Sequence, residues 1–94
     1  VRGKLSLDGG ECRVLKKEGR SLLSVGVVQS SGSYTRGDQV VCVDEAGLEI
    51  GRGLSNYGSL DVQKLCRVSS DRIESILGFV AEEELIHRDN FILA

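Results

Sequence analysis

The sequence has 94 residues, of which 40% are hydrophobic and 28% charged, and its formal net charge is −2. A chain of this length buries one modest core, which argues against a second core or a deep reaction cleft. No apolar run approaches the roughly 20 residues of a membrane helix, and the first residues lack a signal-peptide pattern. We therefore expect one cytoplasmic domain, 1–94, with no membrane partner.

The charges are unevenly distributed along the chain. Residues 1–37 carry seven basic and three acidic side chains, whereas residues 38–94 carry five basic and eleven acidic ones. An overall basic surface for nucleic acid is therefore excluded, while a local basic face stays open. The three cysteines, Cys12, Cys42 and Cys66, are far apart, which argues against a disulfide framework or a zinc knuckle and favours buried, reduced thiols.

The first quarter of the chain predicts a strand followed by a helix. Residues 4–7 alternate and indicate a short strand, which Asp8 and two glycines interrupt. Asp8 can cap a helix over 11–18, and Gly19 is suited to ending it in the left-handed conformation. The apolar, partly β-branched run 21–29 predicts a second strand, with Gly26 at a bulge or a close backbone approach. Residues 30–33 and 37–38 predict turns.

The middle of the chain predicts a β-hairpin. Residues 39–43 form an apolar run suited to a strand buried on both faces, and 48–50 alternate as a returning strand. Between them, 44–47 read as the connection, with Gly47 free to take a positive φ.

The last third predicts two short helices and a final strand. Ser59 is expected to cap a helix with apolar residues at Val62, Leu65 and Cys66. A second helix starts at Ser69 or Ser70, presents Ile73, Ile76 and Leu77, and ends at Gly78. We interpret glutamates 82–84 as a solvated surface and predict a strand at residues 91–93. These elements predict a mainly β fold with short helices (α+β), a small barrel-like mixed sheet whose ends the helices cover.

The sequence contains no group of residues with the pattern of a catalytic or metal site. His87 is the single histidine and lies two residues from Asp89, but no nucleophile elbow accompanies it, so we interpret it as a hydrogen-bonded structural residue. One histidine and three scattered cysteines do not match a zinc spacing. Gly47, Gly51 and Gly53 fit hairpin geometry better than a phosphate-binding loop. We therefore assign no catalytic, cofactor-binding or metal residue.

The strongest surface candidate is the basic group Lys16, Lys17 and Arg20. These side chains can contact phosphates, or they can offset the partial negative charge of a helix C-terminus. The residues alone leave both interpretations open.

Several glycine-punctuated blocks resemble the PUA domain family, and within it the C-terminal PUA domains of bacterial glutamate 5-kinases, the first enzymes of proline biosynthesis. The blocks are LSLDGG at 5–10, GRSLLSVGV at 19–27, GSYTRGDQV at 32–40, GLEIGRGLSNYGS at 47–59, ILGF at 76–79 and LIHRDNFIL at 85–93. Two departures are Ser24, where proline is usual, and Cys66, where glycine is common.

The resemblance implies a PUA-like pseudo-barrel of mixed strands. It also implies that the chain is part of a longer, homo-oligomeric kinase, as the start at Val1 without methionine suggests, and that a preceding amino-acid-kinase domain binds ATP, Mg and glutamate. The leading hypothesis is a non-catalytic accessory module for regulation or assembly. The alternative is binding of structured RNA, for which the resemblance implies Lys16, Lys17, Arg20 and Ser21. A stand-alone enzyme is the least favoured hypothesis.

Overall fold

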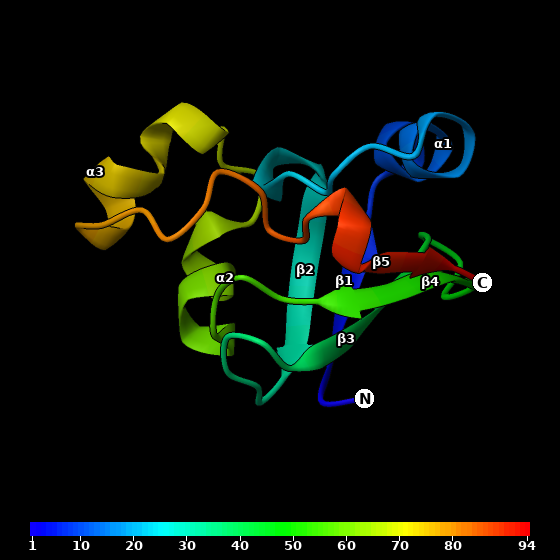
Figure 1. Cartoon of the computed structure of the whole chain (residues 1–94), viewed down its shortest axis with the longest axis horizontal. Helices are drawn as coiled ribbons and strands as arrows, with labels where there is room; N and C mark the ends of the chain where they lie inside the picture. Colours follow the sequence, from blue (N-terminus) through cyan, green and yellow to red (C-terminus); the bar gives the residue numbers. More distant parts are fainter.

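A computed structural model describes all residues, 1–94, and shows one mixed sheet with helices at its two ends (Figure 1). The strand order is β2-β1-β3-β4-β5. Along the chain the elements are β1 (Gly3–Leu7), α1 (Gly9–Glu18), β2 (Val27–Gly32), β3 (Gln39–Val43), β4 (Glu49–Leu54), α2 (Ser59–Leu65), α3 (Ile73–Leu77) and β5 (Phe91–Leu93). Three single 3-10 turns span Ser24–Gly26, Ser70–Arg72 and Arg88–Asn90.

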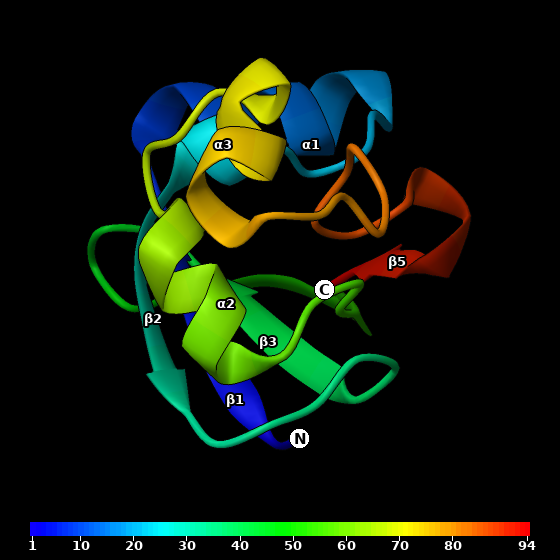
Figure 2. The ribbon, with the colours of Figure 1, turned by 90° about the vertical axis from the view of Figure 1, so that its left-hand side faces the viewer.

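The sheet is built around the parallel pair β1 and β3. β1 pairs antiparallel with β2 on its other side, and β3, β4 and β5 continue as antiparallel neighbours. β2 and β4 run in clearly different directions in Figure 1, as the twist of a small curved sheet requires. Figure 2 shows α2 and α3 on one side, with α2 against β2. The predicted mainly β fold with short helices is confirmed.

One cluster of 16 buried residues forms the core. β1 and β3 contribute alternate residues, such as Leu5 and Val40, while α1 contributes Cys12 and Leu15. The cysteines are all free, with Cys12 and Cys42 buried and Cys66 half-buried. Burial raises the pKa of the Cys42 thiol to about 12, so this thiol stays protonated at neutral pH.

Most local predictions are confirmed. The strand at 4–7 is β1, the strand at 39–43 is β3, and the hairpin turn places Gly47 at φ 86°. Asp8 caps α1, because its Oδ1 accepts the Glu11 amide hydrogen at an N···O distance of 2.7 Å. Gly19 ends this helix at φ 59°, and Gly78 ends α3 at φ 85°.

Three local predictions are wrong, and each error has a long-range cause. The expected strand at 21–29 is broken by the Ser24–Gly26 turn, where the Ser24 hydroxyl donates to the Val68 carbonyl at 2.6 Å. The expected turn at 30–33 is largely strand, because β2 continues along β1 to Gly32. Gly58, rather than Ser59, is the N-cap of α2, and the Ser59 hydroxyl instead accepts the Tyr34 amide.

Asp8 links two helices. Its Oδ1 caps α1, and its Oδ2 accepts a hydrogen bond from Arg67 Nη1, just beyond α2. Arg67 has a φ of 66°, the left-handed value that a non-glycine residue adopts at some strain, and its amide donates to the Ser24 and Val27 carbonyls. The Glu11 amide and the Arg67 guanidinium together hold the pKa of Asp8 below its ordinary value of 3.8.

Replacing Asp8 by alanine is expected to lower the free energy of unfolding by about 1–2 kcal/mol at pH 7, the usual effect of losing an N-cap. Asp8→Asn keeps a capping oxygen but loses the charge, so its loss should be smaller. Since the folded state lowers the pKa of Asp8 from 3.8, the stabilisation is complete above about pH 5 and is lost as the pH falls through the unfolded and then the lower folded value. Urea unfolding at pH 7 and pH 2.5 checks this, and an unchanged pH dependence in Asp8→Asn would contradict it.

Candidate functional site

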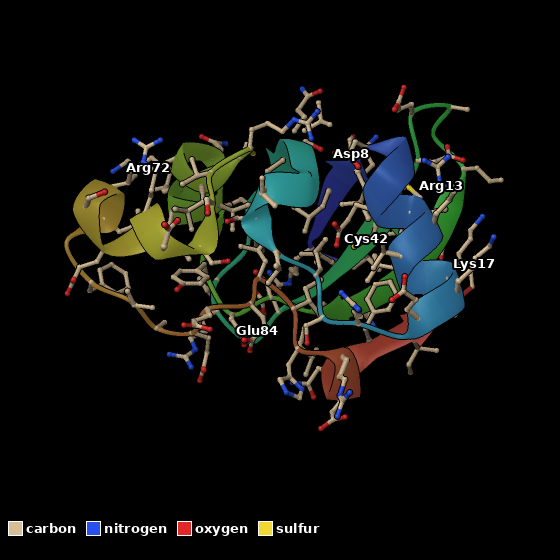
Figure 3. The ribbon with its side chains drawn as sticks, turned by 90° about the horizontal axis from the view of Figure 1, so that it is seen from above. Asp8, Arg13, Lys17, Cys42, Arg72 and Glu84 are labelled. Atoms are coloured by element: carbon tan, nitrogen blue, oxygen red, sulfur yellow. The ribbon has the colours of Figure 1, made fainter.

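A row of basic side chains lies on the exposed side of α1. Arg13, Lys16 and Lys17 are three and four residues apart, so they share one face of the helix. All three are exposed, and none lies within 4 Å of a carboxylate. Figure 3 shows Arg13 and Lys17 projecting outward from this helix. The row therefore presents three free cations, of which Lys16 and Lys17 lie in the last turn, next to the negative end of the α1 dipole.

Arg20 and Ser21 follow the left-handed Gly19 and leave the helix in a different direction. Arg20 Nε lies 3.0 Å from Glu18 Oε1, and both side chains are largely exposed. The Ser21 hydroxyl oxygen accepts the Arg88 amide hydrogen at 2.9 Å. The predicted residues thus divide into two groups, with the lysines on α1 and Arg20 and Ser21 beside the C-terminal segment.

A shallow depression, here called the notch, lies where these two segments meet. Its volume is about 390 Å³ and its lining residues are Arg20, Ser21, Leu23, Glu84, His87 and Arg88. Backbone hydrogen bonds join the two walls, from the Leu22 amide to the Ile86 carbonyl at 2.9 Å and from the Leu85 amide to the Leu22 carbonyl at 2.8 Å. Residues more than 60 positions apart are therefore held in fixed positions around one small depression.

His87 has a structural role, as predicted. Its Nδ1 accepts the Asp89 amide hydrogen at 3.1 Å and caps the 3-10 turn Arg88–Asn90. The Asp89 carboxylate also lies 3.6 Å from this nitrogen. Because Nδ1 acts as an acceptor, the neutral ring carries its proton on Nε2. The imidazole therefore contributes a donor to the wall of the notch.

Two basic residues of this region, Arg13 and Arg88, were missing from the prediction. Arg13 is recognisable in the sequence, since it lies three and four residues before the two lysines on a predicted helix. Arg88 reaches the site through the Leu22–Ile86 bridge, which no local pattern reveals. Glu18 and Glu84 also lie among these cations, so the surface has mixed charge.

A second depression, of about 430 Å³, lies between the segments 33–35 and 58–61. It has no basic side chain, and Tyr34 and Ser59 close its floor with hydrogen bonds of 2.9 and 3.3 Å. No three His, Cys, Asp or Glu side chains converge anywhere in the chain as a metal site would require. The α1 row and the notch are therefore the candidate sites.

Residues 3–77 match the PUA domain family. The strand order and the short helices described above agree with this match. The chain belongs to this family. It is also similar to glutamate 5-kinases, with 53% identity over 93 residues in Pseudomonas putida strain W619 and 49% over 94 residues in Methylococcus capsulatus. These matches cover 99% and 100% of the chain but 25% of each kinase, so the chain spans about a quarter of their length.

Solved structures show the same fold. A PUA domain from Aeropyrum pernix, in a tartrate complex, is 32% identical with a TM-score of 0.65, covering 69% of this chain and 35% of that one. The archaeal box H/ACA sRNP Nop10–Cbf5 complex gives a TM-score of 0.64 over 99% of this chain and 23% of that one; at 11% identity it shows the fold alone. None of the helices here has the length and apolar character to cross a membrane.

Proposed function

We propose that this chain is a non-catalytic accessory domain of a glutamate 5-kinase, acting in regulation or assembly of that enzyme. The observation that carries the proposal is the 53% identity over 99% of the chain to a kinase of which it covers 25%. The remaining three quarters of such a kinase would contain the amino-acid-kinase domain, in the same polypeptide and in a homo-oligomeric, cytoplasmic enzyme.

The side chains of the candidate sites support binding rather than reaction. The α1 row supplies exposed cations, and the notch supplies hydrogen-bond donors around one carboxylate. We therefore assign the ATP and Mg²⁺ sites to the kinase domain and a positioning or signalling role to this one.

Removing these 94 residues from the parent kinase tests the proposal. The truncated enzyme should still phosphorylate glutamate, because the chemistry belongs to the other domain. Its half-inhibitory proline concentration should shift by about 5-fold or more, the lower end of ordinary coupling between sites, or its subunit number should change. Activity assays and light scattering measure both. Unchanged rate, inhibition and mass would overturn the proposal.

A second candidate function, binding of structured RNA, is favoured by the α1 row. Lys16 and Lys17 carry no carboxylate partner, while Arg20, paired with Glu18, and Ser21 follow beyond the end of the helix. Cations presented on one helix face can follow the phosphates of a folded RNA, whose recognition rests largely on shape and backbone contacts. The Nop10–Cbf5 complex, itself part of a ribonucleoprotein, gives an analogy of fold.

Lys16→Glu combined with Lys17→Glu is expected to weaken binding to a tRNA hairpin by at least about 10-fold at 50 mM salt. The slope of log affinity against log salt should decrease by roughly 1.5–2, since two phosphate contacts are lost. Lys64→Glu with Arg72→Glu is the matched control, because it makes the same charge change on α2 and beside α3. Figure 3 shows Arg72 at the opposite end of the domain from Lys17. Equal losses in both variants, or no binding by the parent chain, would exclude this function.

A further inference from the structure

The notch contains one free carboxylate and one free guanidinium. Glu84 and Arg88 both line it, yet neither lies within 4 Å of an oppositely charged group, and they do not pair with each other. Opposite charges on the same wall, four residues apart in sequence, that leave each other unpaired can both be satisfied by one ligand carrying both charges. This pattern differs from the α1 row, where every free charge is positive.

Hydrogen-bond donors gather around Arg88. The Ser21 oxygen uses a lone pair to accept the Arg88 amide, which leaves its own hydrogen free to donate. The Nε2–H of His87 and the guanidinium of Arg88 add further donors, and Arg20 engages Glu18 through Nε, which leaves its terminal nitrogens free. A guanidinium with neighbouring hydroxyl and imidazole donors suits the two oxygens of a carboxylate.

Glu84, in contrast, favours a positively charged group on the ligand. Its backbone carbonyl is held by the Asn56 side-chain amide at 3.0 Å, so the residue is anchored while its carboxylate stays unpaired. This carboxylate accepts hydrogen bonds and attracts an ammonium group, and it repels a ligand that is purely anionic. The half-exposed Leu23 adds an apolar patch, and the volume of about 390 Å³ lies in the small-molecule range of about 300–1,000 Å³.

We propose that the notch binds a free α-amino acid. The ligand carboxylate lies against Arg88, Ser21 and His87, its ammonium group lies against Glu84, and its side chain faces Leu23. The binding itself is a property of this chain. That the bound amino acid regulates a kinase rests on the proposed function, since a ligand held between both walls stabilises the Leu22–Ile86 junction.

Titration of the 94-residue chain with L-glutamate and L-proline tests the site. Amide chemical shifts of Ser21, Leu23 and Arg88 should move with a dissociation constant on the order of 1 mM, as expected for a small ligand in an open depression. Succinate, which has the carboxylates but no ammonium group, should bind at least about 5-fold more weakly at matched ionic strength. Equal affinity for glutamate, proline and succinate, or shifts confined to other regions, would overturn the proposal.

Glu84→Gln gives the sharper test, because it has opposite effects on two ligand classes. Affinity for the amino acids should fall by about 10-fold, while affinity for succinate and for RNA phosphates should rise. Glu83→Gln, at the exposed neighbouring position, is the matched control and should change neither. Arg88→Ala should weaken amino acids and succinate alike, and Arg88→Lys should restore part of the loss.

If Glu84→Gln and Glu83→Gln behave alike, the notch does not recognise a zwitterion and the inference fails. It also fails if RNA binds the notch and amino acids do not compete with it. Circular dichroism of each variant establishes that the fold is intact. These measurements need no kinase domain, so they fail or succeed independently of the truncation experiment.

Discussion

Tyr57→Phe is expected to lower the free energy of unfolding by about 2–3 kcal/mol, a large effect for the removal of one oxygen atom. The Tyr57 hydroxyl accepts the Ala81 and Glu82 amide hydrogens, each at 3.1 Å, and donates to the Glu82 carbonyl. Its ring is buried and contacts Phe79 at a centroid distance of 6.3 Å, which phenylalanine preserves. The variant therefore isolates three part-buried hydrogen bonds, each of which contributes about 0.5–1.5 kcal/mol.

Tyr34→Phe is the matched control. Tyr34 is similarly buried, but its hydroxyl makes one hydrogen bond, to the Ser30 hydroxyl at 2.7 Å, so a loss of about 0.5–1 kcal/mol is expected. Urea unfolding followed by circular dichroism compares the two. Hydrogen exchange should also show faster opening at Ala81 and Glu82 in the Tyr57 variant, because that segment loses its anchor. Equal losses in both variants would contradict this role for Tyr57.

Gly53→Ala is expected to destabilise the domain by about 1–3 kcal/mol and to loosen β5. A Cβ atom at Gly53 would lie 2.6 Å from Ile86 Cγ2 and 2.8 Å from the Asn90 carbonyl oxygen. The second contact is with backbone, which cannot rotate away, so β5 must shift from β4. Ile86 also belongs to the bridge beside the notch, so the chemical shifts of Leu22 and Arg88 should change as well.

Gly10→Ala is the control for this effect. Gly10 lies within α1, and the nearest atom to its added Cβ is Asp8 Oδ1 at 3.5 Å, an ordinary contact. Alanine favours helix over glycine by up to about 1 kcal/mol, so this variant should be slightly more stable than the parent. Opposite signs for the two glycine substitutions are the expected result, and a stable Gly53→Ala variant would show that β5 is not closely packed there.

Local patterns in the sequence predict the elements whose causes are local. The Asp8 cap, the Gly47 turn and the apolar strand β3 depend on neighbouring residues, and all are found where predicted. The errors occur where distant residues decide the structure. Serines 30–31 have the composition of a turn, but they extend because the facing strand β1 offers them hydrogen-bond partners.

In the candidate site, too, the residues placed by local sequence were predictable, and those placed by distant contacts were not. The α1 row follows from helical spacing, and Lys16 and Lys17 lie on it as expected. Arg20 belongs to the basic group that the residues themselves indicate, and Ser21 is implied by the resemblance. Neither pattern indicates Glu84 and Arg88, because a bridge between residues 22 and 86 brings them to this site. The sequence therefore predicts a basic surface and gives no indication of the carboxylate that lies beside it.

The bridge between Leu22 and Ile86 also constrains the order of folding. Protein synthesis delivers the first wall of the notch long before the second, and β1, β2 and β3 can pair while residues 84–88 are still absent. The loop between the two walls is long, so its entropy must be lost before their contacts stabilise the junction. The notch is thus among the last features of the domain to form, and a polypeptide interrupted shortly before Glu84 would have a nearly complete sheet but no notch.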